Sequence, residues 1–218
     1  MNIITNPYFT AKEISPLNHG ETHTWLGKTT HHLAEIKGQW VARELYHLNH
    51  DYVGYERIFF FHDNKENQYP KRPSFVSTYD GEKTPLFTPI NIKFNDLFTA
   101  TTFMIVGGYA DGVTIFNAIT DQNTAILAIQ GESNTPLLVE QLSERFPNTR
   151  IIAALDGDKA GRQAAIRSNC EWVTPNHGDW NDLYREHGIQ AVAQQLKQIV
   201  NPIPDFNVWE LQRPNIGN

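Results

Sequence analysis

The sequence predicts an α/β protein whose second half is a parallel β-sheet flanked by helices. Beyond residue 100, short apolar runs alternate with segments of helical length and pattern. Each apolar run ends in glycine or polar residues, and such alternation is typical of parallel βαβ units. Because ligands bind at the carboxyl ends of the strands in open parallel sheets, we expect the functional residues at those ends.

The elements of the second half follow in a regular order. The segment 135–146 illustrates the helices, because its apolar residues Leu138 and Leu142 recur at helical spacing. The apolar runs are strand-sized and closed by glycine or aspartate. We expect strands at 102–106, 124–129, 150–155 and 172–174, and helices at 111–120, 135–146, 159–169 and over most of 181–200.

The first half is predicted to be rich in β-strands. Residues 40–47 and 52–62 flank a short polar turn, as in a hairpin. Residues 63–89 are rich in proline and charge and are expected to form a long loop, which in a compact domain is usually functional or disordered. We therefore expect a first unit over residues 1–100, a second over 101–200, and a tail or linker over 201–218.

The composition is that of an ordinary folded protein. The 218 residues are 40% hydrophobic and 19% charged, enough for one large or two small domains. The apolar runs are too short to cross a bilayer, and the N-terminus lacks the pattern of a secretory signal. The single cysteine, Cys170, excludes an internal disulfide and a multi-cysteine zinc ribbon. We therefore expect a cytoplasmic protein that does not enter a membrane.

The charge is unevenly distributed. The net charge of −6 argues against a protein that coats nucleic acid by charge alone. Residues 1–100 carry 10 basic and 11 acidic side chains, whereas residues 101–218 carry 8 and 13. An acidic half beside a nearly neutral half fits a metal site next to a surface that approaches phosphates, although ordinary surface variation gives the same skew.

The strongest chemical signal is the carboxylate pair of Asp156-Gly157-Asp158, at the end of an expected strand. Residues two apart at a strand end can point both carboxylates into one cleft, and Gly157 permits a close approach. Two such carboxylates repel each other unless a divalent cation lies between them, and hard oxygen ligands favour Mg²⁺ or Mn²⁺. An aspartate that only begins the following helix gives the same local pattern, so a capping role stays open.

Two further segments follow strand ends. After the fourth strand, Asp179 and Asp182 bring more carboxylates to the same edge, although Asp179 or Asn181 is expected to cap the last helix. The turn at 107–108, ahead of Asp111, has the glycine content of a turn that binds phosphate at a helix start. All three segments are expected to meet at one edge of the sheet.

Together the three segments resemble the Toprim motif set of bacterial primases, topoisomerases and related nucleases. In that set a strand ends in Glu-Gly, and a later strand ends in Asp-x-Asp-x-x-Gly-Arg-x-Ala, which residues 156–164 match. The third motif of primases from plasmids, phages and satellite elements is similar to residues 179–183. The resemblance covers roughly residues 40–190 and is strongest over 102–188. It implies a Rossmann-like Toprim sheet flanked by helices, preceded by a smaller β-rich α/β subdomain.

The resemblance also implies roles for individual residues. It implies a cofactor, Mg²⁺ or Mn²⁺, with Asp111 as an outer or second-metal ligand near the catalytic centre. The basic residues of the first half would contact the nucleic acid, although they can equally be solvated loop charges. The implied metal ligands are Asp156, Asp158, Asp179 and Asp182, and the implied nucleic-acid contacts are Lys71, Arg72, Lys83 and Arg162.

One departure from the family pattern affects catalysis. Gly107 stands where the family has the glutamate of its first motif, which is described as a metal ligand or a general acid/base in nucleotidyl transfer. Without that glutamate, catalysis needs a substitute or is lost. Glu132, at the tip of the neighbouring strand, either takes its catalytic place or is an ordinary exposed loop acid.

The resemblance implies a primase of a mobile element that joins nucleoside triphosphates into short primers on single-stranded DNA. A replicative helicase is a further expected partner. Two alternatives stay open: a non-catalytic Toprim module that binds nucleic acid or a replication partner, which Gly107 favours, and a Toprim nuclease that uses the same carboxylates. We recognise no zinc ribbon and no helicase segment, so we expect a fragment of a longer protein or a stand-alone domain.

Overall fold

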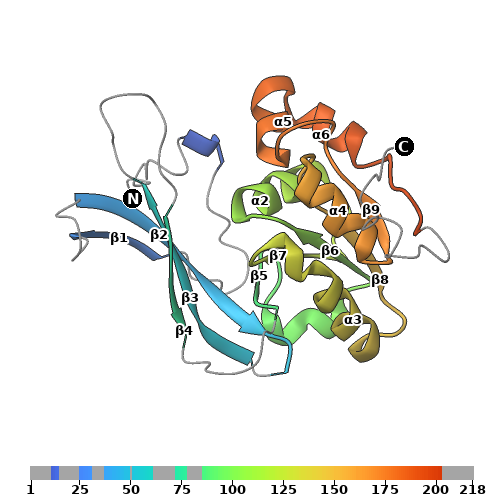
Figure 1. Cartoon of the computed structure of the whole chain (residues 1–218), viewed down its shortest axis with the longest axis horizontal. Coiled ribbons are helices and arrows are strands. Elements are labelled where there is room, and N and C mark those ends of the chain that lie inside the picture. The colour runs from blue at the N-terminus through green and yellow to red at the C-terminus, as the bar shows by residue number, and fades with distance from the viewer. Residues whose placement is uncertain are drawn as a thin grey trace, which may run out of the picture.

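The structure of the chain is a computed structural model, and it describes residues 11–14, 25–30, 37–49, 51–60, 72–77 and 85–202 (Figure 1). Within these residues, nine strands form one mixed sheet with the order β4-β3-β2-β5-β7-β6-β8-β9, and β1 pairs with β2. The strands are β1 (Trp25–Thr30), β2 (Lys37–His47), β3 (Asp51–Phe60), β4 (Arg72–Ser77), β5 (Phe87–Pro89), β6 (Thr102–Val106), β7 (Thr124–Ile129), β8 (Arg150–Ala154) and β9 (Glu171–Val173).

The first half contributes an antiparallel arm, defined here as strands β1 to β4, which extends to one side of the second half in Figure 1. The predicted hairpin is confirmed, because β2 and β3 are consecutive strands that pair antiparallel. The long loop predicted for residues 63–89 is wrong in part, since β4 and β5 lie within it. Sequence reasoning missed β4 because of its proline, Pro73. Strand β4 lies at the edge of the sheet order, and edge strands are where proline is found within sheets.

The second half has the predicted parallel sheet. Strand β6 pairs in parallel with β7 on one side and β8 on the other, and β9 pairs in parallel with β8. Every residue of β6 and β7 is buried, which explains why these strands are continuous apolar runs and not alternating ones. The carboxyl ends of β7, β6 and β8 therefore lie side by side at one edge.

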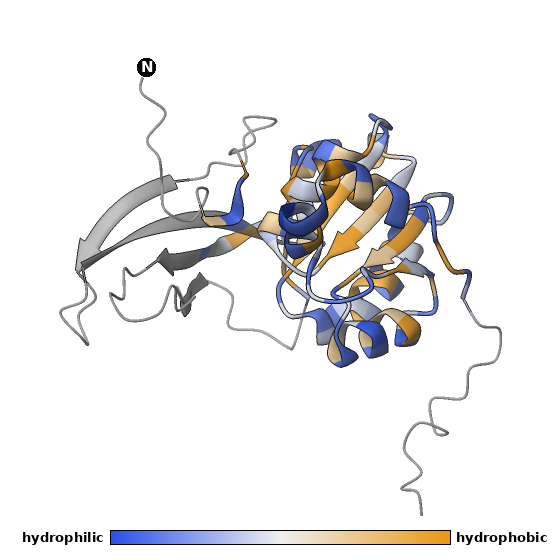
Figure 2. Cartoon of the chain, turned by 90° about the horizontal axis from the view of Figure 1, so that it is seen from above, coloured by the Kyte–Doolittle hydropathy of each residue, from blue (hydrophilic) through white to orange (hydrophobic). Residues whose placement is uncertain are grey.

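Helices cover both faces of this sheet, so that the apolar strands lie between two helical layers (Figure 2). Met104 and Val106 of β6 face the core formed with α2, α5 and α6, whereas Phe103 and Ile105 face the core formed with α3 and α4. The helices are α2 (Tyr109–Ala118), α3 (Thr135–Arg145), α4 (Lys159–Arg167), α5 (Trp180–His187) and α6 (Ile189–Gln195), with short 3-10 turns η1 (Phe94–Thr99) and η2 (Glu132–Asn134).

The helical predictions need two corrections. Helix α2 begins two residues before the predicted start, at Tyr109. The segment predicted as mostly helical over 181–200 is two helices, because Gly188 between α5 and α6 has a φ of 80°, which an α-helix cannot include. Of the helices in the described ranges, none combines the length and apolarity needed to cross a membrane.

The sheet and the core continue across residue 100. Strand β5 pairs with β2 on one side and with β7 on the other, so it joins the arm to the parallel strands. Phe87, Ile90 and Leu97 pack in the two cores of the second half. The division into units at residue 100 therefore stays a prediction, and residues 203–218 of the expected tail lie outside the described residues.

Candidate active site

The Asp-Gly-Asp turn, residues 156–158, follows the end of β8 and depends on close backbone contacts. The Gly157 amide donates to the Gly178 carbonyl at 2.8 Å. A Cβ on Gly157 would lie 2.4 Å from the Pro175 carbonyl oxygen, and one on Gly161 would lie 2.4 Å from the Asp156 carbonyl oxygen. Neither distance admits a side chain, so the spacing Asp-x-Asp-x-x-Gly has a steric cause.

The two aspartates of this turn have different environments. Asp158 caps helix α4, because its Oδ1 accepts a hydrogen bond from the Gly161 amide at 2.8 Å. The capping role left open by the sequence is thus observed, and it uses one of the two carboxylate oxygens. Asp156 is partly buried, and its buried Oδ1 has no hydrogen-bond partner among the described residues.

Burial and neighbouring charges raise the pKa of Asp156 to about 8. Burial is the larger cause, followed by repulsion from the carboxylates of Asp111, Glu132, Asp179 and Asp158. We call these five carboxyl groups the acidic cluster. They come from different elements of the second half, and their mutual repulsion would be relieved by a cation of charge +2.

Glu132 lies beside Asp156, at the tip of β7. Its Oε1 accepts a hydrogen bond from the Asp156 amide at 2.8 Å. Burial raises the pKa of Glu132; the hydrogen bond from Asp156 opposes this shift, and the charge of Asp158 adds to it. A Cβ on Gly107 would lie 2.7 Å from Glu132 Oε1 and 3.2 Å from Asp156 Oδ1. The Glu132 carboxylate therefore fills the space directly beside Gly107.

The third acidic segment, residues 179–182, is fixed against β8 and α2. Asp179 caps α5 by accepting the Asp182 amide at 2.6 Å, which decides between the two capping residues expected from the sequence. The fully buried indole of Trp180 donates to the Ala154 carbonyl at 3.0 Å. The Asn181 amide donates to Asp111 Oδ1 at 3.1 Å, so α2 and α5 meet at the acidic cluster.

Comparison with known proteins assigns this architecture. Residues 104–184 match the model of a family described as Toprim-like. The match runs from β6 into α5 and so includes all the strand ends that carry the acidic cluster. The second half of the chain therefore has a Toprim-like fold.

Solved structures show that the Toprim domain and the strands before it have a primase fold. One is the structure of bacteriophage T7 lagging-strand DNA polymerase interacting with primase domains bound to an RNA/DNA hybrid and dTTP. It matches with a TM-score of 0.56 and 14% identity, and the match covers 84% of this chain and 86% of that chain. The primase fragment of the bacteriophage T7 primase-helicase protein also has a TM-score of 0.56 and 14% identity, over 80% of this chain and 67% of that one.

A bacterial structure has the same fold. The RNA polymerase domain of Mycobacterium tuberculosis primase DnaG, in complex with a double-stranded DNA oligomer with a 6-nucleotide overhang, matches with a TM-score of 0.50 and 19% identity. The match covers 74% of this chain and 54% of that chain, so this chain spans about half the length of the mycobacterial one.

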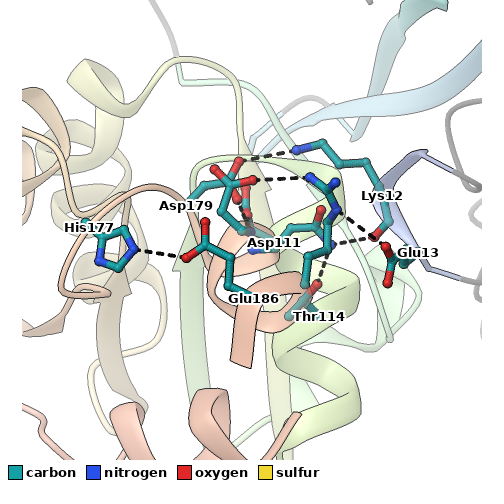
Figure 3. Close-up of polar contacts among 10 residues, drawn as sticks. Lys12, Glu13, Asp111, Thr114, His177, Asp179 and Glu186 are labelled. Carbon is teal, nitrogen blue, oxygen red and sulfur yellow. Dashed lines mark hydrogen bonds and ion pairs between the residues drawn. The ribbon is translucent and has the colours of Figure 1, made fainter. Parts of the chain in front are cut away.

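The acidic cluster also contacts a residue that the sequence did not predict for the site. Lys12 Nζ lies 3.3 Å from Asp179 Oδ2, so a lysine from the start of the chain reaches the acidic cluster (Figure 3). The two residues are 167 positions apart. No local pattern signals such a contact, because it depends on where the folded chain places the segment 11–14.

Not every predicted site residue joins the acidic cluster of the Toprim domain. Asp182 lies beside Arg185, with Oδ1 3.7 Å from Nη1, and its charge is not among those that raise the pKa of Asp156. Arg162 donates to three backbone carbonyls, those of Gly157, Pro175 and Asn176, and so ties the Asp-Gly-Asp turn to the following loop. Metal binding by Asp182 and phosphate binding by Arg162 stay predictions.

The other predicted nucleic-acid contacts lie at the limit of what the structure describes. Lys71 and Lys83 are outside the described residues. Arg72 is the first residue of β4, where the backbone is described and the side chain is not. Their contacts with nucleic acid also stay predictions.

A second group with metal-ligand chemistry lies near the far end of α5. Glu186 Oε2 is 3.1 Å from His177 Nε2 and 3.7 Å from His187 Nε2, within a set whose ligand atoms lie within 4.8 Å of one another. All three side chains are more than half exposed, at 65%, 54% and 55% for His177, Glu186 and His187. The acidic cluster differs, because it contains a buried carboxylate oxygen, Oδ1 of Asp156, that no described residue satisfies.

Proposed function

We propose that the chain is a primase-type nucleotidyltransferase that binds Mg²⁺ or Mn²⁺ and joins nucleoside triphosphates into short primers on single-stranded DNA. The observation that carries the proposal is the buried Oδ1 of Asp156, which has no partner among the described residues and lies among four further carboxyl groups, within a primase-like Toprim fold. A carboxyl group whose pKa is raised by burial and by neighbouring carboxylates, as that of Asp156 is, is typical of sites where a cation or a reacting proton is held.

The residues present fit a divalent cation. Asp156, Asp158 and Glu132 would hold it, with Asp111 and Asp179 as outer or second-metal ligands, because all five offer hard oxygen atoms and crowd negative charge at one edge of the sheet. When bound, the cation supplies positive charge to the triphosphate and acidifies the attacking hydroxyl group. The protein contributes the geometry: the backbone of the Asp-Gly-Asp turn packs so closely at Gly157 and Gly161 that neither position admits a side chain.

Glu132 would take the role of the glutamate that the family pattern places at position 107. Its Oε1 lies where it would contact the first carbon of any side chain at Gly107, and it is anchored by the Asp156 amide. Glycine at 107 and glutamate at 132 are therefore complementary: a side chain at 107 would displace the Glu132 carboxylate. Its raised pKa also suits Glu132 to exchange a proton with a reacting hydroxyl group.

Template and partners follow from the basic residues and from the similar proteins. Lys71, Arg72 and Lys83 would contact the phosphates of a single-stranded DNA template in a salt-sensitive manner, with Arg162 near the triphosphate. The T7 protein of similar fold is a primase-helicase, and we propose a replicative helicase as partner of this chain as well.

A non-catalytic Toprim module that binds nucleic acid is the second candidate, and the absence of a glutamate at Gly107 favours it. A Toprim nuclease is the third, because the same carboxylates can serve strand cleavage. The three functions differ in what they need. Primer synthesis requires nucleoside triphosphates, cleavage requires only metal and DNA, and a binding module does neither.

The deciding experiment incubates the full chain with single-stranded template, labelled nucleotides and Mn²⁺. Labelled short products that need both template and triphosphates support the proposal, and template fragments alone support the nuclease. The control is Asp156→Ala/Asp158→Ala, which should abolish Mn²⁺ binding in calorimetry. Without metal, the relief of repulsion should be offset by loss of the Asp158 cap on α4, which costs about 1 kcal/mol, so the variant should still fold. Equal Mn²⁺ affinity in both proteins would contradict the proposal.

A further inference from the structure

We propose that Lys12 is a further residue of the active site, whose ammonium group binds a phosphate of the nucleoside triphosphate; the inference rests on the proposed function. Lys12 lies in the segment 11–14, which is far from the Toprim domain in sequence and contacts α5 in the fold (Figure 3). The segment thus forms one side of the acidic cluster.

The side chain of Lys12 is suited to bind an anion beside the carboxylates. Its Nζ lies 3.3 Å from Asp179 Oδ2, and the Lys12 and Asp179 side chains are 25% and 24% exposed, so the ammonium is held at the cluster and still reached by solvent. An ammonium group has three N–H donors. The bond to Asp179 uses one of them, which leaves donors for phosphate oxygens.

Three contacts fix the backbone around Lys12. The Lys12 carbonyl accepts a hydrogen bond from Asn181 Nδ2 at 2.8 Å, and Asn181 is fully buried. Ile14 is buried in the core shared with α2, α5 and α6. Glu13 lies 3.8 Å from Arg185 on the outside of α5. Because the backbone is fixed at this point, the lysine is held in place before a ligand arrives, which lowers the entropy lost on binding.

The charge balance of the site favours such a group. A triphosphate is a polyanion, and the acidic cluster repels it wherever the metals do not offset the carboxylates. Arg162 is engaged with three backbone carbonyls. Lys159, the first residue of α4, is exposed and is the neighbouring lysine on the Asp-Gly-Asp side. Lys12 differs from it in being bonded directly to a carboxylate of the cluster.

A purely structural ion pair is the competing explanation of the same contact. Such a pair would affect the melting temperature and leave nucleotide affinity unaltered. Exchange of lysine for arginine separates the two roles further, because arginine keeps the positive charge and the donors.

The test measures binding by calorimetry on the full chain, first of Mn²⁺ alone and then of ATP in the presence of Mn²⁺. Lys12→Met should weaken ATP binding by about tenfold or more, the effect expected from loss of a charge-assisted hydrogen bond, and leave Mn²⁺ affinity equal or higher. Lys12→Arg should keep most of the ATP affinity. Lys159→Met, which removes the same charge nearby, should weaken ATP binding by less than about threefold.

The outcomes separate the two proposals. If wild type binds Mn²⁺ and Lys12→Met binds ATP as wild type does, the inference about Lys12 is wrong and the proposed function stands. An equal loss in Lys12→Met and Lys159→Met, or a loss that accompanies a lower melting temperature in Lys12→Met and Lys12→Arg alike, also overturns it. If wild type binds no Mn²⁺, the proposed function itself fails, and the inference fails with it.

Discussion

The Asp-Gly-Asp turn and the third acidic segment supply carboxylates to the same cluster but are held in place in different ways. The turn combines local contacts, in which Asp158 accepts from the Gly161 amide and Gly161 packs against Asp156, with hydrogen bonds from its Gly157 and Asp156 amides to Gly178 and Glu132. The third segment is held by partners 26 and 70 positions away for Trp180 and Asn181. A short motif can therefore specify the cap and the Gly161 contact of the turn, whereas the buried contacts of Trp180 and Asn181 depend on the whole fold.

The largest expected effect tests Glu132, which anchors the turn from the neighbouring strand. Glu132→Ala should lower primer synthesis by at least about 100-fold, the usual loss when an acid/base group is removed. Gly107→Glu should add little in the presence of Glu132, because its side chain begins 2.7 Å from the Glu132 carboxylate. The double variant Gly107→Glu/Glu132→Ala should regain activity. The measurement is primer synthesis, with Mn²⁺-dependent melting of each protein.

Two other results would each contradict this assignment. Activity that persists in Glu132→Ala and rises in Gly107→Glu would indicate a decayed enzyme whose first-motif glutamate was not replaced. Inactivity of all four proteins, with no difference in their response to Mn²⁺, would favour the binding module.

The second prediction breaks the turn itself. Gly161→Ala should destabilise the fold by roughly 3 kcal/mol, because its methyl group would lie 2.4 Å from a backbone oxygen that has no room to move. Gly131→Ala is the matched control: its methyl group would meet only Asn134, at 3.6 Å, and its cost is the strain of a φ of 76°, about 1 kcal/mol. Urea denaturation measures the free energy of unfolding of both variants. Equal losses would show that the close backbone contact at Gly161 does not add to the cost of the methyl group.

The third prediction concerns pH and again addresses the turn. The pKa of Asp156 is raised from 3.8 to about 8, so below pH 8 a cation must displace a proton from it. Mn²⁺ affinity should therefore rise by up to about tenfold per pH unit between pH 6 and 8 and then level off. Without cation, stability should fall as pH rises between about 4 and 8, because the unfolded chain loses this proton first. Asp156→Asn should remove the contribution of this carboxyl group to the pH dependence of Mn²⁺ affinity and to the pH dependence of stability. Calorimetry would measure the first and melting curves the second.

The fourth prediction separates the contacts that hold the third segment. Asn181→Ala should cost about 1–2 kcal/mol, because it removes buried hydrogen bonds to the Lys12 carbonyl and Thr114 Oγ1. Arg185→Gln removes only exposed ion pairs with Glu13 and Asp182 and should cost less than about 0.5 kcal/mol. Chemical denaturation of both variants measures the difference, and a larger loss for Arg185→Gln would mean that surface charge holds the segment.

The same contrast explains what the sequence could predict. The parallel strands and the Asp-Gly-Asp turn were predictable because burial on both faces and local backbone contacts leave a direct trace in composition and spacing. Strand β4 was missed because prolines are typical of loops, although an edge strand accepts them. Lys12 was missed because its place beside Asp179 is set by the packing of Ile14 and Asn181, which no spacing reveals.

Strand β5 has a mechanical consequence for the acidic cluster. Only three residues long, it bonds to the arm through β2 and to β7 through Phe87 and Ile129, and the next amide, that of Gln130, donates to the Leu86 carbonyl at 2.8 Å. Glu132 follows two residues later. A force that bends the arm is therefore transmitted through β5 to the loop that carries Glu132. A template strand bound to the arm would therefore stay at a constant distance from the carboxylates of the acidic cluster.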